Sequence, residues 1–201
     1  MSQGNRPLLL EQLARYAYQW SPEKVYPLSS GGFSNEYLDC KSGLSRAEAM
    51  AALGPLLCSM LDSSIAAVGG LTMGADPLAM SASQASAQTG RALRWFSVRK
   101  DAKEHGLRKK IEGSVRQGER VAVFDDVVTK GDSTIKAIRA CRDAGFVVVQ
   151  VIVLVDREQF EGIAKIRQEA GVPVDAIFKK SEIATEWHRL NPMQNGLRAT
   201  G

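Results

Sequence analysis

Short apolar runs alternate with stretches of helical period over most of the chain between residues 65 and 178. The apolar runs have few polar breaks, which is typical of strands that are buried on both faces of a parallel sheet. The runs cover residues 65–68, 95–98, 121–124, 146–155 and 174–178, and the helical stretches cover 78–89, 135–144 and 160–170. This alternation predicts an α/β fold in which a parallel sheet carries helices on both faces.

The N-terminal part of the chain has a different pattern. Residues 6–20 have an amphipathic period and predict a helix. Residues 25–40 have an extended pattern that is broken by Ser-Ser-Gly-Gly at 29–32, and this predicts two short strands around a turn.

Helix-start signals mark two further elements. Ser45 and Glu48 have the spacing of a capping box, which predicts a helix from there to about residue 61. Near the other end of the chain, a short helix is expected from Ser181 and an irregular tail from residue 191.

The segment from Arg120 to Thr134, RVAVFDDVVTKGDST, combines several features of a ligand site. Its apolar strand is followed by two carboxylates, Asp125 and Asp126, then by a loop of small residues and a helix. Gly131 lets a ligand approach the backbone closely, and the first amides of the helix can bind a phosphate group. The aspartates would repel a phosphate, but they can accept hydrogen bonds from sugar hydroxyls or help to hold a hydrated divalent cation.

Three further segments follow predicted strands in the same way. They are the glycine-rich loop 69–74, the basic segment from residue 99 onward, and the pair Asp156-Arg157. Ligands of parallel sheets bind beyond the carboxyl ends of the strands. We therefore expect these segments and residues 125–134 to form one site.

Charge is concentrated in one of these segments. The chain has a formal net charge of +4, and residues 99–110 contain six basic and two acidic residues, so this segment alone carries +4. Such a local cluster argues against a general nucleic-acid-binding surface, and its length and position are typical of a lid. Its bases, together with His105, could stabilise negative charge on a ligand.

Composition excludes several classes of protein. A hydrophobic fraction of 44% over 201 residues is sufficient for one folded core. No apolar stretch is long enough to cross a membrane, and the N-terminus lacks the apolar region of a signal peptide. Cys40, Cys58 and Cys141 are far apart in sequence, so we expect free thiols and a cytoplasmic protein.

The segment 121–134 resembles the phosphoribosyl-diphosphate signature of the type I phosphoribosyltransferases, which is an apolar strand, two acids and a T-x-G-x-[ST] loop. The stretch FSVRKDAKEHG, followed by IEGSV, is similar to the catalytic loop of the orotate phosphoribosyltransferases within that class. Residues 69–79 and 153–158 are similar to the same family, and the likeness covers roughly residues 25–182.

The resemblance implies a particular version of the α/β fold. Residues 1–201 would form a single phosphoribosyltransferase domain. Its parallel-sheet core, roughly residues 45–180, would have helices on both faces. A small hood would be formed by roughly residues 1–44 plus the C-terminal segment.

The resemblance also implies an activity. The 5-phosphoribosyl group of phosphoribosyl diphosphate would pass to orotate, giving orotidine 5-phosphate and diphosphate in pyrimidine (UMP) biosynthesis. Mg²⁺ would be the cofactor, bound mainly through the substrate and with no direct protein ligand. The protein would be a homodimer in which the basic loop 99–116 is shared across the subunits.

Site residues follow from the same resemblance. The catalytic residues would be Lys103, His105, Asp125 and Asp126. Orotate would be bound by Arg157, whose guanidinium suits its carboxylate, and by Thr129, Phe33 and Ser34. The residues implied to bind phosphoribosyl diphosphate are Arg99, Lys100, Lys103, His105, Asp125, Asp126, Val127, Val128, Thr129, Lys130, Gly131, Asp132, Ser133 and Thr134.

Two positions depart from the pattern of some family members. Ser29 and Met73 stand where those members have lysines, which removes two cations from the phosphate site, and Lys130 is a candidate to compensate for them. Two alternatives remain open on the sequence. One is a phosphoribosyltransferase for another base, and the other is a nucleic-acid-binding regulator that senses phosphoribosyl diphosphate.

Overall fold

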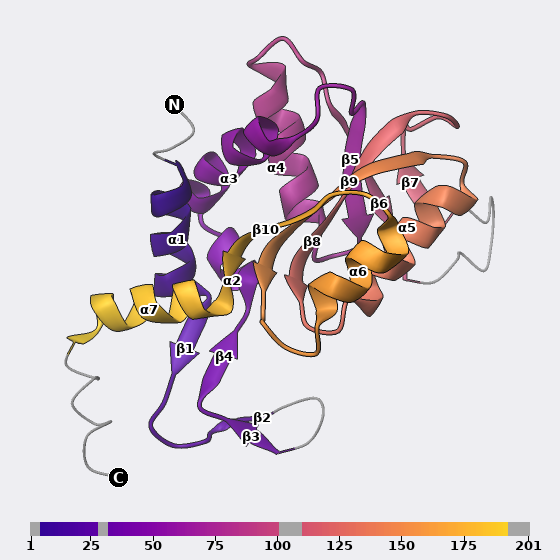
Figure 1. The fold of residues 1–201 in the computed structure, drawn as a ribbon. Helices are drawn as coiled ribbons and strands as arrows, with labels where there is room; N and C mark the ends of the chain where they lie inside the picture. Colours follow the sequence, from indigo (N-terminus) through magenta and orange to yellow (C-terminus); the bar gives the residue numbers. More distant parts are fainter. Residues whose placement is uncertain (1–4, 28–31, 101–109, 193–201) are drawn as a thin grey trace.

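The centre of the molecule is a six-stranded sheet with the strand order β10-β9-β8-β5-β6-β7 (Figure 1). The computed structural model describes residues 5–27, 32–100 and 110–192. The strands are β5 (Ala67–Leu71), β6 (Arg94–Val98), β7 (Ile111–Gly113), β8 (Arg120–Val128), β9 (Val147–Asp156) and β10 (Val174–Lys179). All neighbouring pairs are parallel except β6 and β7. The predicted α/β fold is confirmed.

Helices cover both faces of this sheet. Successive side chains of β8 point to opposite faces, and both faces are covered, which explains why its apolar run has no polar break. Ala122 and Phe124 belong to the core beneath the helices α3 and α4, whereas Val121 and Val123 belong to the core beneath α5 and α6. Both faces of the strand are therefore buried. The four helices are α3 (Ala47–Met60), α4 (Asp76–Ala87), α5 (Asp132–Asp143) and α6 (Gly162–Ala170).

The two ends of the described chain meet beside the sheet. The N-terminal helix α1 (Asn5–Tyr16) packs against the C-terminal helix α7 (Lys180–Leu190), and two short antiparallel strand pairs extend from them (Figure 1). The rings of Tyr18 and Trp187 lie 5.9 Å apart. The short elements are β1 (Tyr18–Trp20), β2 (Tyr26–Pro27), β3 (Phe33–Ser34), β4 (Glu36–Leu38) and the helix α2 (Cys40–Leu44). We call these nearby elements, with α1 and α7, the hood.

Several predicted boundaries are wrong. The helix expected over 6–20 ends at Tyr16, because Tyr18–Trp20 pairs with β4. The expected capping box does not form within the described chain: Arg46 is the N-cap of α3, and the Ser45 hydroxyl donates to the Ser42 carbonyl instead. Ser45 is the C-cap of α2, a helix that is too short to produce a periodic pattern.

Two differences affect the region of the site. The strand expected over 121–124 continues to Val128, so Asp125 and Asp126 lie within β8 rather than after it. β7 lies in a charged segment where the sequence showed no apolar period, because three residues at a sheet edge carry too little pattern.

Glycine is required in the middle of β5. A Cβ atom on Gly69 would collide with the carbonyl oxygen of Phe96 in β6, and one on Gly70 would collide with that of Phe124 in β8. These glycines let β5 lie between its two neighbours where the strands approach the site.

We therefore expect Gly69→Ala to lower the free energy of unfolding by about 1–3 kcal/mol, because the added methyl group must push rigid backbone apart. Urea unfolding followed by circular dichroism measures this. Ser63→Ala, at an exposed position just before the same strand, is the control and should change stability by less than about 0.5 kcal/mol. Equal stability of the two variants would contradict the packing argument.

Candidate active site

The acidic pair at the end of β8 consists of two unlike carboxylates. Asp125 is 5% exposed; it accepts a hydrogen bond from the Thr134 hydroxyl at 2.6 Å and another from the Asp126 amide at 3.0 Å. Burial raises the pKa of Asp125 to about 7; the Thr134 bond opposes this rise and the neighbouring charge of Asp126 adds to it. Asp125 is thus almost fully buried, and the Asp126 side chain, on the opposite face of the strand, is 13% exposed.

The loop after β8 has the geometry of an anion site. Gly131 has a φ of +83°, a left-handed conformation that favours glycine, and it is the N-cap of α5. The first amides of α5 have no intrahelical acceptors, and the helix dipole adds positive potential there. A cavity of about 300 Å³ opens at this point. Its lining consists of Asp125, Val127, Val128, Thr129, Lys130, Gly131, Asp132, Ser133 and Arg157.

Arg157 reaches this cavity from the next strand. It directly follows β9, and its amide donates to the carbonyl of Val128 at 3.0 Å. Its side-chain Nε is buried and has no hydrogen-bond partner among the described residues. A buried guanidinium nitrogen without a protein acceptor is costly unless a ligand supplies one. The expected meeting of Arg157 with the 129–133 loop is confirmed.

Asp126 is held by residues from two other segments. A Cβ on Gly74 would collide with its carboxylate, so the glycine-rich loop after β5 lies directly against it. On the hood, Lys41 Nζ is 3.0 Å from Asp39 and 3.9 Å from Asp126. The pKa of Lys41 is raised, mainly by its bond to Asp39 and further by the charge of Asp126. Sequence reasoning missed Lys41, because no spacing relates a short hood helix to β8.

A second cavity, of about 1000 Å³, lies along β6 and β7. Arg99 and Lys100 line it together with Thr72 and Met73, and Met73 is 68% exposed. Arg99 also forms an ion pair with Glu112 at 3.5 Å. Within the described chain, the linings of the two cavities have no residue in common, so Arg99 and Lys100 do not line the cavity of Arg157.

The remaining predicted residues are placed as follows. Phe33 and Ser34 form β3 of the hood, with Phe33 60% exposed, and neither belongs to the described lining of the Arg157 cavity. Thr134 is buried against Asp125 rather than open to a ligand. Lys103, His105 and Ser29 lie outside the described residues, and their expected roles stay predictions.

Other expected features can be compared with the described chain. Its three cysteines are free, and burial raises the pKa of Cys40 and, to about 12, that of Cys141. None of its helices is long and apolar enough to cross a membrane. The described residues contain no group of three or more His, Cys, Asp or Glu side chains that could hold a metal ion.

The chain is similar to several known proteins over most of its length. No protein-family model matches the chain. The orotate phosphoribosyltransferase of Aquifex aeolicus is 37% identical over 179 residues, which are 89% of this chain and 97% of that protein. The protein of the same name from Nostoc sp. is 39% identical over 186 residues, which are 92% of this chain and 88% of that protein.

Solved structures agree in fold. The orotate phosphoribosyltransferase of Mycobacterium tuberculosis in complex with Fe(III) dicitrate has a TM-score of 0.77 and 35% identity, covering 89% of this chain and 98% of that one. The complex of the M. tuberculosis protein with phosphoribosyl diphosphate has a TM-score of 0.71 and 30% identity, covering 90% and 92%. The sheet and the acidic strand–loop–helix unit thus define a type I phosphoribosyltransferase. Since the identity to relatives extends over most of their length, the chain belongs to the orotate phosphoribosyltransferase family.

The raised pKa of Asp125 predicts how the stability of a variant without this carboxylate depends on pH. The pKa is about 7 in the folded protein against an ordinary value of 3.8, so below pH 4 both states hold the proton. As pH rises through 7 the folded carboxyl ionises and the cost of its burial is fully present. Asp125→Asn should therefore raise the melting temperature at pH 8 and have little effect at pH 4, measured without substrate or divalent ions.

Asp143→Asn, an exposed aspartate at the other end of α5, is the matched control and should show the same small change at both pH values. A gain for Asp125→Asn that is equal at pH 4 and pH 8 would mean that burial of its charge is not the cause.

Proposed function

We propose that the protein transfers the 5-phosphoribosyl group of phosphoribosyl diphosphate to orotate, releasing diphosphate and forming orotidine 5-phosphate for pyrimidine biosynthesis. The family supports this reaction. The observation that carries it is the cavity that Arg157 lines together with the anion-binding loop 129–133; the buried Nε of Arg157 has no hydrogen-bond partner among the described residues. A guanidinium suits a carboxylate, and the amides of the loop suit a phosphate.

The residues of the site have different proposed roles in binding phosphoribosyl diphosphate. The amides of loop 129–133 bind the 5-phosphate, with the hydroxyls of Thr129 and Ser133 beside them. Asp125, which lines the cavity, and Asp126, on the other face of β8, are proposed to accept hydrogen bonds from the ribose hydroxyls. Asp125 also fixes the loop, because its bond to Thr134 connects the end of β8 to the first turn of α5. The Thr134 hydroxyl is thereby assigned to Asp125 rather than to the phosphate.

Transfer needs no covalent intermediate with the protein. A ring nitrogen of orotate attacks the anomeric carbon while the bond to diphosphate breaks, and positive charge develops on the sugar. Positioning of the two substrates and stabilisation of the departing charge are then the main catalytic effects. Arg157 fixes the orotate carboxylate, a pairing that suits its planar guanidinium, and Phe33 and Ser34 are proposed to border the base from the hood.

Cations for the diphosphate come from the basic loop 99–116. Arg99 and Lys100 line a cavity separate from that of Arg157, which supports a homodimer in which the loop of one subunit serves the site of the other. Lys103 and His105 belong to the same loop and are proposed to contact the leaving group. Lys130, which lines the Arg157 cavity, is proposed to add a further cation there.

Mg²⁺ is the proposed cofactor, and the acidic pair fits it. Mg²⁺ keeps several waters and is held by one or two carboxylates together with substrate phosphates, rather than by a cage of protein ligands. Asp125 lines the cavity beside the anion-binding loop, so a hydrated ion held mainly by phosphoribosyl diphosphate would have a carboxylate close to its waters there. The buried free thiols of Cys40 and Cys141 support a reducing compartment, for which we propose the cytoplasm.

Turnover is tested by the fall in orotate absorbance on mixing with phosphoribosyl diphosphate and Mg²⁺, with uracil and adenine as alternative bases. We expect loss of orotate only, and arrest of the reaction by EDTA. Arg157→Ala should raise KM for orotate at least about tenfold with little change in KM for phosphoribosyl diphosphate, because a charged bidentate contact is lost.

Arg139→Ala removes an exposed arginine that pairs with Glu169 outside the site, and it serves as the control. Turnover of another base, or an unchanged KM for orotate in Arg157→Ala, would remove the role proposed for Arg157.

Sharing of the loop between subunits predicts complementation. Lys103→Ala and the double variant Asp125→Asn/Asp126→Asn should each be nearly inactive alone. In a heterodimer of the two, the Lys103→Ala subunit supplies an unmodified acidic pair and the other subunit supplies an unmodified loop, so one of the two sites is complete. Coexpressed in equal amounts, they should recover about a quarter of wild-type activity, since half of the dimers then have one complete site. No recovery in dimers confirmed by light scattering would show that the loop acts within its own subunit.

A further inference from the structure

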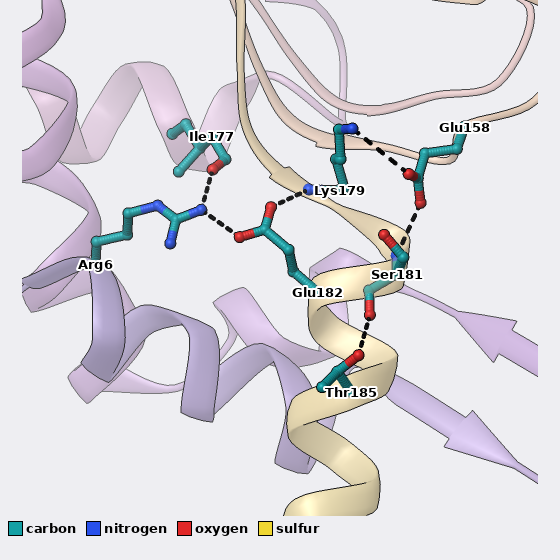
Figure 2. A network of polar contacts seen from close by, with 7 residues as sticks. All are labelled: Arg6, Glu158, Ile177, Lys179, Ser181, Glu182 and Thr185. Atoms are coloured by element: carbon teal, nitrogen blue, oxygen red, sulfur yellow. Dashed lines mark hydrogen bonds and ion pairs between the residues drawn. The ribbon is translucent and has the colours of Figure 1, made fainter.

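A network of polar contacts surrounds the first turn of α7, and one of its members is the residue after Arg157 (Figure 2). The Glu158 carboxylate accepts a hydrogen bond from the Ser181 amide at 3.0 Å. Its other oxygen lies 3.9 Å from Lys179 Nζ, an ion pair that is weak because the lysine side chain is 63% exposed. The hydrogen bond from the Ser181 amide places the Glu158 carboxylate at the positive end of the helix dipole, where a negative charge is favoured.

The backbone of Glu158 is held in an uncommon conformation. Its φ is +58°, a left-handed value that non-glycine residues rarely adopt. Its amide donates to the Asp156 carboxylate at 2.8 Å, so the three residues Asp156, Arg157 and Glu158 form a tight turn directly after β9. Such a conformation persists only when the surroundings hold it. The bond to Ser181 supplies one such contact from outside the turn.

The first turn of α7 is itself firmly anchored. Glu182 accepts a hydrogen bond from the Lys179 amide at 2.9 Å and one from Arg6 of α1 at 2.6 Å (Figure 2). Arg6 also donates to the Ile177 carbonyl in β10 at 3.0 Å. A further ion pair joins Lys180 to Glu36 of the hood. These contacts make the start of α7 a fixed reference between the sheet and the hood.

We propose that Glu158 is a positioning residue for orotate, which it places by fastening the turn that carries Arg157 to the N-terminus of α7. The proposal rests on the contact proposed above between Arg157 and the orotate carboxylate. The guanidinium must arrive at the carboxylate in a defined plane to make both hydrogen bonds, and a loosened turn would spread its orientations. The phosphate loop 129–133 follows another strand, β8, and is tied to that strand by the hydrogen bond that Thr134, just after the loop, donates to Asp125.

The test compares Glu158→Ala with Glu161→Ala in the orotate assay. Glu161 has the same side chain and the same left-handed backbone, at φ +51°, but makes no capping bond to α6 within the described chain. Glu158→Ala should raise KM for orotate about threefold to tenfold, which corresponds to the loss of about one ordinary hydrogen bond, and leave KM for phosphoribosyl diphosphate and kcat unchanged. Glu161→Ala should match the unmodified protein.

Two more variants separate the contact from the backbone strain. Glu158→Gln keeps an oxygen that can accept from the Ser181 amide and should restore a KM close to that of the unmodified protein. Glu158→Asn tolerates the left-handed conformation but is too short to reach Ser181, so it should behave like Glu158→Ala even if the alanine variant folds poorly.

The outcomes distinguish this proposal from the function on which it rests. If Arg157→Ala raises KM for orotate while both Glu158→Ala and Glu158→Asn match Glu161→Ala, the positioning role is wrong and the role of Arg157 stands. An equal rise in both KM values together with a lower melting temperature would show a purely structural role and overturn the proposal. If Arg157→Ala leaves KM for orotate unchanged, the contact with orotate and the positioning role are both wrong.

Discussion

The hydrogen bond between the Thr134 hydroxyl and the buried carboxylate of Asp125 is the contact on which the site depends. It connects the last part of β8 to the first turn of α5, and the anion-binding loop 129–133 lies between its two ends. Burial of the carboxylate is unfavourable, as its pKa of about 7 records, and the bond to Thr134 offsets part of that cost. Burial of this carboxylate lowers the stability of the folded protein, and the same contact gives the loop a defined shape.

The other segments of the site are placed by the same edge of the sheet. Because β5, β6, β8 and β9 are parallel, the loops after them all emerge on one side, and Gly74, Asp126 and Arg157 can approach one another although they are distant in sequence. The hood adds Lys41 to this edge from a different part of the chain. The site is therefore shared between a rigid sheet and a hood that is fastened to it through α7.

Fold class and the central motif could be predicted from local pattern. The unbroken apolar runs specify strands that are buried on both faces, and the alternation with helical stretches specifies their parallel direction. Prediction failed where the pattern was short or where side chains competed. β7 and α2 have three and five residues. Ser45 had the spacing of a capping residue, but it bonds to the preceding helix.

By itself, the sequence determined the alternation of the parallel strands with their helices, the acidic pair, the glycine-containing loop and the family, because each of these depends on residues that are neighbours in the chain. Tertiary structure alone decided that Asp125 is almost fully buried and lines the cavity, that Lys41 reaches Asp126, and that Glu158 binds the start of α7. Each of these depends on a contact between residues that are far apart in the chain or on the face of a strand that packing covers. Local periodicity has no information about either, since burial and charge pairing are set only when the elements pack together.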